Sequence, residues 1–310
     1  MRAVAVAELG VKAEVQELPI PEPEPGEVRV RVHAASVNGF DLAMVAGYMQ
    51  GYFEYRFPAV VGKDYAGVVD AVGADVTGFA LGDRVFGTVT KPYLREGSYA
   101  EYTTVAQGVG IAPLPESISF EEGAALGLAG SAALAALAGA ELSPGQVALV
   151  IGATGGVGAH VVQLAAAAGA RVLATAHTDD EVAHLRSLGV RDIVDYGADL
   201  AMQVRQLTGD GADVVFHFAG DPAAALAAAK DGGKLVSLLV YSPDSLPSET
   251  VAVIPAFADP TPETLARLAE NHRSGRTATP IMRRFPLNEA PEALAAFTEG
   301  TLGKIVITVD

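Results

Sequence analysis

The chain has 310 residues, of which 50% are hydrophobic, and its formal net charge at pH 7 is −16. This size and hydropathy are typical of a globular chain that can bury the cores of two domains, and the negative charge argues against nucleic acid and membranes as partners. The chain has no cysteine, which excludes disulfides and thiolate metal ligands. We see no apolar run of about 18 residues, the length of a membrane-spanning helix, and no cleavable-signal pattern, so we expect a cytoplasmic protein.

Residues 1 to about 115 are predicted to be rich in β-strands. Segments such as EVRVRVHAASV (Glu27–Val37) and AGVVDAV (Ala66–Val72) are short, rich in β-branched residues and separated by Gly, Pro and Asp. LPIPEPEPGE (Leu18–Glu27) is predicted to be an extended, proline-rich connector. The last segment, GKIVITVD (Gly303–Asp310), has a strand pattern again. We expect it to rejoin this first β-rich part.

The chain changes character at Phe120, where alanine-rich helical periods begin. Strands and helices then alternate, which predicts right-handed crossovers and a parallel sheet covered on both faces, an α/β fold. VAVIPAF (Val251–Phe257) is a further candidate strand, followed by a helix from Pro262. The other predicted strands are Val147–Ile151, Arg171–Ala176, Asp192–Asp195, Asp213–Phe218 and Lys234–Val240, and helices are expected from about Gly156, Asp180, Asp199 and Pro222.

A glycine-rich turn joins the first of these strands to its helix. In such a turn one glycine permits the tight bend, another lets phosphates reach the backbone, and a third lets helix and strand pack closely. The turn is therefore predicted to bind the diphosphate of a dinucleotide, the alternative being a tight turn without a ligand. Its residues are Gly152, Ala153, Thr154, Gly155, Gly156, Val157 and Gly158.

The end of the second strand bears on the choice of cofactor. A carboxylate there would hold the ribose 2′-hydroxyl of NADH and repel the 2′-phosphate of NADPH. The strand ends at Ala176 and is followed by His177 and Thr178, with no acid at its tip. We therefore predict NADPH, with His177 and Thr178 as candidate phosphate contacts. The alternative for His177 is a solvated loop residue.

Several segments in their order along the chain resemble the medium-chain dehydrogenase/reductase superfamily, and within it the zinc-free quinone oxidoreductase branch. They are VNGFDLAMVAGY (Val37–Tyr48), FPAVVGKDYAGVVDAVGADVTGFALGDRVFG (Phe57–Gly87), GSYAEYTTV (Gly97–Val105), LGLAGSAALAAL (Leu126–Leu137), GATGGVG and GKIVITV. The resemblance implies a GroES-like β-barrel catalytic domain at 1–115, completed by 259–310, and a Rossmann NAD(P)-binding domain at 116–258. It also implies an active site in the cleft and a homodimer joined through the edges of the cofactor sheets, with Val251–Phe257 as the candidate edge.

The chain departs from the zinc-dependent alcohol dehydrogenases of this superfamily at both signature positions. Where those enzymes have a cysteine before Gly-x-Asp and a histidine after glycine, this chain has Asn38 and Lys63. We therefore expect no catalytic zinc. Without a Lewis acid, the expected reaction is hydride transfer to a quinone or to an α,β-unsaturated carbonyl compound, both of which can delocalise the incoming charge.

The candidate catalytic residues are Asn38, Lys63 and Tyr48. The Asn38 amide is expected to donate to a substrate carbonyl or to the nicotinamide ribose, the alternative being a cap of the following turn. Lys63 is either a donor to the developing negative oxygen or the partner of Asp64 in a structural ion pair. Tyr48 is a candidate proton donor. Asp41 is expected to brace the following helix rather than to take part in chemistry.

Other residues are implied near the nicotinamide. Relatives have a serine or threonine at the place of Ser131, although a serine inside a helix also bonds the preceding turn. Phe218 and Ala219 follow a strand where the backbone can approach the cofactor, and Tyr241 follows the next one. His217 is expected to be a buried structural histidine.

These observations predict a zinc-independent, NADPH-dependent reductase of small-molecule quinones or enones. One alternative is an enoyl-thioester reductase of a biosynthetic pathway. The other is a non-catalytic, crystallin-like protein that binds NADPH.

Overall fold

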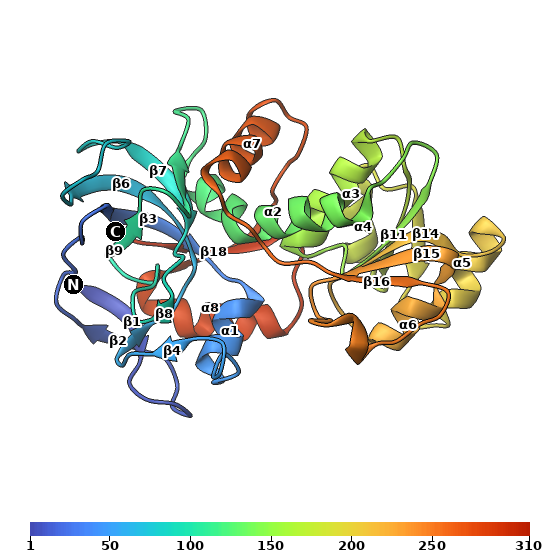
Figure 1. Cartoon of the computed structure of the whole chain (residues 1–310), viewed down its shortest axis with the longest axis horizontal. Coiled ribbons are helices and arrows are strands. Elements are labelled where there is room, and N and C mark those ends of the chain that lie inside the picture. Colours follow the sequence, from blue (N-terminus) through green and yellow to red (C-terminus); the bar gives the residue numbers. More distant parts are fainter. The chain divides into compact units, whose positions relative to one another are not determined.

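The computed structural model describes all 310 residues, and the chain divides into two compact units. Unit 1 comprises Met1–Leu128, Pro260–Arg273 and Ile281–Asp310, and unit 2 comprises Ala129–Asp259 and Ser274–Pro280. The colours of Figure 1 follow the chain, so the red C-terminal strand can be found among the blue and teal strands of unit 1. The last residues of the chain are thus part of the first unit.

Unit 1 is built on antiparallel strands. Its largest sheet has the order β10-β7-β6-β3-β18-β17, with β9 also paired to β3. The strands of this sheet are β3 (Glu27–Ser36), β6 (Asp64–Val72), β7 (Arg84–Thr88), β9 (Tyr102–Ala106), β10 (Ile111–Pro113), β17 (Ile281–Pro286) and β18 (Lys304–Thr308). Smaller sheets are formed by β1 (Arg2–Val6), β2 (Glu14–Glu17) and β5 (Ala59–Val60), and by β4 (Glu54–Tyr55) and β8 (Tyr93–Leu94).

Strand β3 shows why the sequence folds this way. Its valines alternate with charged residues, and Val28, Val30 and Val32 are buried while Arg31 is exposed. The far end of β3 pairs with β18, with Ala35 opposite Ile307. The prediction that the C-terminal segment rejoins the β-rich part is therefore confirmed.

Four helices contribute to unit 1. They are α1 (Gly39–Val45), α7 (Pro262–Arg273), α8 (Ala290–Thr298) and the first part of α2 (Phe120–Ala140). Helix α2 has 21 residues, and by length and hydropathy alone it could cross a membrane. The expectation that no apolar run is this long was therefore wrong, because the alanine and leucine residues of α2 give it a mean hydropathy of 1.6. Within the protein 72% of its most apolar window is buried, as in a core helix.

Unit 2 is a parallel sheet with the strand order β13-β12-β11-β14-β15-β16. The chain runs from the centre to one edge and then returns to build the other half, so the order reverses between β11 and β14. All neighbouring pairs are parallel, which confirms the predicted α/β sheet. The strands are β11 (Val147–Ile151), β12 (Arg171–Ala176), β13 (Asp192–Asp195), β14 (Ala212–His217), β15 (Ala229–Ser237) and β16 (Ala252–Pro255).

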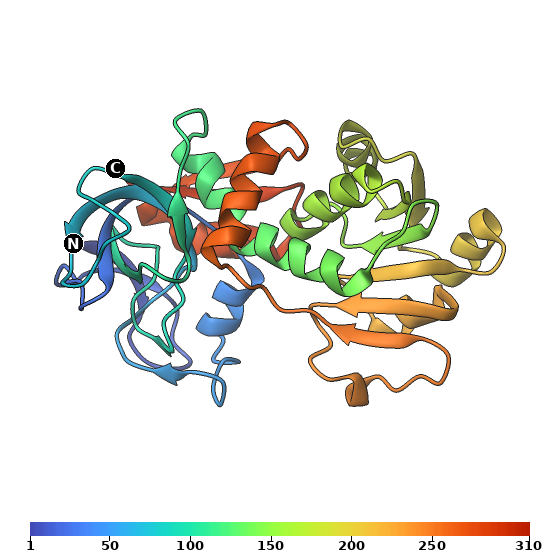
Figure 2. The same ribbon diagram turned by 45° about the horizontal axis from the view of Figure 1, so that its top comes forward.

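Helices cover both faces of this sheet (Figure 2). One hydrophobic core joins the sheet to the second half of α2, to α3 (Gly156–Ala167) and to α4 (Asp179–Ser187). The other core joins it to α5 (Leu200–Thr208) and α6 (Pro222–Ala227). Since strand residues are buried on both sides, the strands are nearly continuous apolar runs such as VALVI.

Gly158 lies where α3 packs on the loop that precedes it. A Cβ atom there would be 2.3 Å from the carbonyl oxygen of Gly152 and 2.5 Å from the Cα of Ala153. Both are backbone atoms, so the clash cannot be relieved by a rotamer change. We expect Gly158→Ala to lower the free energy of unfolding by about 1–3 kcal/mol, measured by urea denaturation.

Gly108→Ala is the matched control, because a Cβ atom at this exposed glycine would have nothing within 4 Å. An equal loss of stability in both variants would contradict the close packing at Gly158.

Candidate active site

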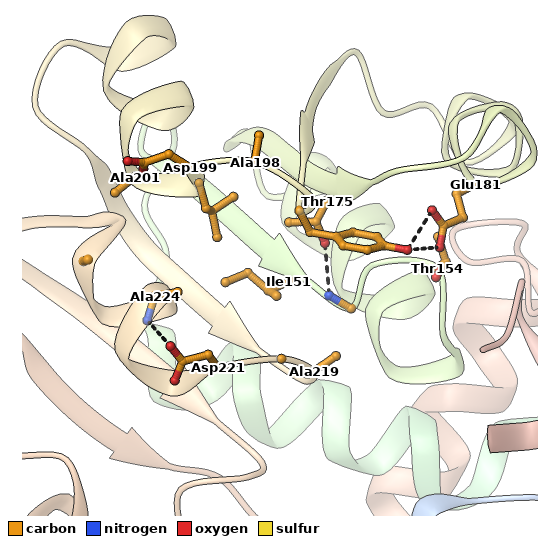
Figure 3. Close-up of a pocket in the computed structure, with 15 residues that line it drawn as sticks. Ile151, Thr154, Thr175, Glu181, Ala198, Asp199, Ala201, Ala219, Asp221 and Ala224 are labelled. Atoms are coloured by element: carbon orange, nitrogen blue, oxygen red, sulfur yellow. Dashed lines mark hydrogen bonds between the residues drawn. The ribbon is translucent and has the colours of Figure 1, made fainter. Parts of the chain in front are cut away.

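Unit 2 has a cavity of about 670 Å³ on the side where its parallel strands end. Figure 3 shows Ile151, the last residue of β11, with Thr175 near the end of β12 and Ala219 just after β14, all lining it. These three strands flank the point where the strand order reverses. In open α/β sheets this is where ligands bind.

The glycine turn lies at one wall of this cavity. Gly152 has φ +78°, a left-handed conformation that favours glycine, and its amide donates to the Thr175 hydroxyl at 3.2 Å. Helix α3 has Gly155 as its N-cap without a capping side chain, and no acid in its first turn. The first intrahelical bond runs from Ala159 to the Gly155 carbonyl, so the amides of 156–158 have no acceptor within the helix. This positive helix end fits a diphosphate.

The structure brings part of the predicted cofactor set to this cavity. Gly152, Thr154 and Ala219 line it. Ala153 and Gly158 are buried at the turn, and Gly155, Gly156 and Val157 are half-buried. Phe218 is half-buried beside Ala219. Ser131 is buried within α2 and does not line this cavity, and Tyr241 is 62% exposed with its ring stacked on Phe257.

The two residues after β12 are engaged within the protein. The Thr178 hydroxyl caps α4 by accepting from the amide of Glu181. His177 Nδ1 lies 2.7 Å from Asp195 Oδ1, and this hydrogen bond, with the attraction of the carboxylate, raises the pKa of His177. Sequence reasoning missed Glu181 and Tyr196, which line the cavity. The capping box Thr178-x-x-Glu181 was the available signal.

His217 is buried and holds two loops together, as expected of a structural histidine. Its Nδ1 lies 2.9 Å from the Ser237 hydroxyl and its Nε2 lies 3.2 Å from the Gly220 carbonyl. The Ser237 oxygen also accepts from the amides of Leu239 and Val240, so its proton is directed to Nδ1 and the ring donates from Nε2. Burial lowers the pKa of His217 and favours this neutral form.

Unit 1 contains a network of buried polar groups around the Asp64 carboxylate, which has no exposed surface. Asn38 Nδ2 donates to Asp64 Oδ2 at 2.8 Å, and Lys304 Nζ lies 3.5 Å from the same oxygen. Lys304 also donates to Asn38 Oδ1 at 2.7 Å. The remaining donors to the carboxylate are the hydroxyls of Ser36 and Thr88 and the amide of Leu128. A buried carboxylate is thereby paired and hydrogen-bonded throughout.

This network changes the role expected for Asn38. The second N–H of its amide group is directed at the Ser36 carbonyl, 3.3 Å away. Both amide hydrogens are therefore used inside the protein, and Asn38 has none left for a substrate carbonyl, contrary to the donor role predicted from the sequence. Its oxygen retains one acceptor site besides the bond from Lys304. Asn38 is 8% exposed, and it also begins α1 as the N-cap.

Asp41 closes the first turn of α1 from the other side. Its Oδ2 accepts from the backbone N–H of Asn38 and from the hydroxyl of Tyr99, each at 2.9 Å. Asp41 therefore braces the beginning of α1, as the sequence predicted. Its Oδ1 is buried without a hydrogen-bond partner. Burial raises the pKa of Asp41 to about 7.

Lys63 follows Gly62 in the loop before β6. Its ammonium lies 4.8 Å from the centroid of the Phe40 ring and 5.8 Å from that of Phe53, an arrangement that favours the cation. Burial nevertheless lowers the pKa of Lys63 to about 8, against the opposing effect of nearby carboxylates. The cation paired with Asp64 is Lys304, so the ion-pair alternative for Lys63 is not what the structure shows.

Tyr48 is 75% exposed and borders an apolar groove between α1 and α8. The groove is lined by Gly39, Leu42, Ala43, Val45, Ala46, Tyr48, Leu294 and Ala295. Sequence reasoning missed Lys304, because its partner Asn38 lies 266 residues away in the chain and its partner Asp64 is also distant in the sequence. No group of three or more His, Asp or Glu side chains is arranged to hold a metal ion.

Comparisons with known proteins agree with this organisation. The family model described as "Alcohol dehydrogenase GroES-like domain" matches residues 24–116, and "Zinc-binding dehydrogenase" matches 156–254. The "Chloroplast envelope quinone oxidoreductase homolog" of Arabidopsis thaliana is 29% identical over 307 residues, covering 94% of this chain and 92% of that protein. The "NADPH-dependent alkenal/one oxidoreductase, chloroplastic" of the same plant is 37% identical over 216 residues, 67% of this chain and 53% of that protein. A solved structure described as an NAD-dependent alcohol dehydrogenase has a TM-score of 0.89 and 30% identity, with 100% of both chains covered.

The Asp41 carboxyl generates a prediction about stability. Its pKa of about 7 in the folded protein compares with an ordinary value of 3.8, so between these pH values the folded protein keeps a proton that the unfolded chain has released. The free energy of unfolding should therefore fall as the pH rises from about 4 to about 7, by up to about 1.4 kcal/mol per pH unit from this group. Urea denaturation across this range should show a shallower slope for Asp41→Asn.

The exposed Asp231 serves as the control, because Asp231→Asn also removes one carboxylate. Parallel pH profiles for the wild type and Asp41→Asn would refute a protonated Asp41.

Proposed function

Because the chain belongs to the quinone oxidoreductase branch of the medium-chain dehydrogenase/reductase superfamily, we propose that it reduces a small quinone or α,β-unsaturated carbonyl compound without zinc. It is an oxidoreductase with a GroES-like part and a Rossmann-like part, as the sequence predicted. The observation that carries the proposal is Lys63, a half-buried ammonium whose pKa is lowered to about 8. It takes the place of a zinc ligand in metal-dependent relatives.

The cofactor is a reduced nicotinamide dinucleotide, which supplies the hydride when bound. The amides of 156–158 would hold its diphosphate, with Thr154 and Ala219 at the cavity wall. Two observations favour NADPH. No acid lies at the tip of β12, and one relative is named an NADPH-dependent alkenal/one oxidoreductase. The structural relative, in contrast, is described as an NAD-dependent alcohol dehydrogenase. The carboxylate of Glu181, which lines the cavity, also favours NADH.

Lys63 is proposed as the proton donor. When hydride is delivered to a quinone, or to the β-carbon of an enone, the displaced electron pair moves to oxygen. One proton on that oxygen then gives the hydroquinone, or an enol that tautomerises to the saturated carbonyl compound. An ammonium with a pKa near the working pH both stabilises that negative oxygen and transfers a proton to it. Tyr48, on the exposed face of the apolar groove, is the second candidate donor, and water is the third.

Asn38 is proposed as a positioning residue. Its amide joins Asp64 to Lys304 and fixes the beginning of α1, the helix on which Phe40 lies beneath the Lys63 ammonium. Its one remaining acceptor site could take a ribose hydroxyl of the cofactor. It does not polarise a carbonyl.

A homodimer is proposed from the exposed edge of the unit 2 sheet. Strand β16 (Ala252–Pro255) is the last in the strand order and pairs only with β15, so it can add a further strand from a second copy. Cytoplasmic localisation stays a prediction.

Lys63→Met tests the proton donor. We expect kcat/KM for a quinone or enone to fall by about 10²-fold or more, while the Kd for the reduced cofactor is unchanged. In the wild type the rate should decline above pH 8, because the neutral amine has no proton to give. Lys63→Arg keeps the positive charge, but its guanidinium does not release a proton in this pH range. We therefore expect it to keep the electrostatic stabilisation of the negative oxygen only, with kcat/KM still below that of the wild type and no decline of the rate near pH 8.

If the rate and its pH profile were unchanged in Lys63→Met, Lys63 would not be the proton donor and its role would be structural. The same absorbance assay, run with quinones, enones and enoyl thioesters, separates the alternatives. Preference for a thioester would favour the enoyl reductase, and tight cofactor binding without any turnover would favour a non-catalytic binding protein.

A further inference from the structure

The N-terminus of α4 binds a carboxylate that belongs to the helix itself. Glu181 folds back so that its Oε2 accepts from the amides of His177 at 2.7 Å and Thr178 at 3.0 Å. The Tyr196 hydroxyl donates to Oε1 at 3.0 Å and lies 3.3 Å from Oε2. The dashed lines that end at Glu181 in Figure 3 mark these last two contacts.

These donors form an anion site that is already filled. Backbone amides at a helix N-terminus hold phosphates in many proteins, and the Tyr196 hydroxyl adds a third hydrogen-bond donor here. Burial raises the pKa of Glu181, but the hydrogen bonds from Thr178, His177 and Tyr196 outweigh it and leave that pKa below its usual value. The side chain is therefore ionised at neutral pH. A second anion at the same donors would be repelled by its negative charge.

The filled site lies at the wall of the cavity that fits the dinucleotide. Glu181 and Tyr196 line it together with Gly152 and Thr175. The end of β12, which immediately precedes this site, is where dinucleotide-binding sheets hold the adenosine ribose. The donors of the site are thus on the side of the cavity where a 2′-phosphate would have to be placed.

The charges around the cavity are negative. Its lining includes Asp199 and Asp221 besides Glu181, and no Lys or Arg. The nearby imidazole of His177 is engaged by Asp195. A 2′-phosphate carries close to two negative charges at pH 7. In this cavity it would meet no Lys or Arg, and the nearby imidazole is already paired with Asp195.

We propose that Glu181 determines the cofactor of this enzyme: its carboxylate accepts the ribose 2′-hydroxyl and blocks the 2′-phosphate, so that the protein selects NADH over NADPH. This inference rests on the proposed nicotinamide-dependent function. It reverses the preference expected from the sequence, because the carboxylate comes from the third residue of the helix instead of the strand tip.

Isothermal titration calorimetry tests the inference without turnover. Wild-type protein should bind NADH at least about tenfold more tightly than NADPH. In Glu181→Gln, which removes the charge and keeps the size, the affinity for NADPH should rise and that for NADH should fall, so that the ratio approaches one. Asp180→Asn is the matched control, since Asp180 is in the same helical turn and does not line the cavity. It should leave the ratio unchanged.

Equal or tighter binding of NADPH to the wild type, or an unchanged ratio in Glu181→Gln, would overturn the role of Glu181. Should Glu181→Gln fail to fold, adenosine 2′,5′-bisphosphate and 5′-AMP can be titrated into the wild type instead. We expect the bisphosphate to bind more weakly than 5′-AMP. Equal or stronger binding of the bisphosphate would refute the inference. Binding of none of these nucleotides would instead refute the proposed function.

Discussion

The carboxylate of Asp64 is fully buried, and many segments of unit 1 donate hydrogen bonds to it. It receives hydrogen bonds from β3, from β7, from the residue that precedes α1 and from the backbone of α2, and it faces the ammonium of Lys304 on the C-terminal strand. An unpaired buried charge is very costly, so these segments must come together for any of them to be stable. The requirement explains how a strand at the end of the chain is held in the first unit.

The same network sets the chemistry of its neighbours. The side-chain amide of Asn38 is hydrogen-bonded to Ser36, Asp64 and Lys304. Asn38 is therefore held in one orientation and has no free N–H group for a substrate. Burial disfavours charge in both Asp41 and Lys63, which raises the pKa of the acid and lowers that of the base until both lie near neutrality. Desolvation alone thus gives Lys63 the pKa that the proposed role as a proton donor requires.

In unit 2 the important groups are hydrogen-bond donors. The first turns of α3 and α4 present backbone N–H groups that have no acceptor within the helix. The first turn of α3 has no capping side chain, and its bare glycine turn leaves room for an anion. The first turn of α4 has the same kind of donors, but Glu181 fills them. Under our proposals these two helix ends have opposite roles: the N-terminus of α3 binds a diphosphate, and the N-terminus of α4 excludes a further phosphate.

The sequence by itself determined the parallel sheet, the glycine turn and the return of the C-terminal strand, because hydrophobic periodicity and glycine spacing are local patterns. It could also place Glu181 in a capping box, since that motif spans four residues. Only the tertiary structure decided that Lys304 and not Lys63 pairs with Asp64, that the amide of Asn38 is fully used, and that Glu181 faces the cavity. Such contacts join residues distant in the chain, and their partners are chosen by packing and burial, which a linear pattern does not encode.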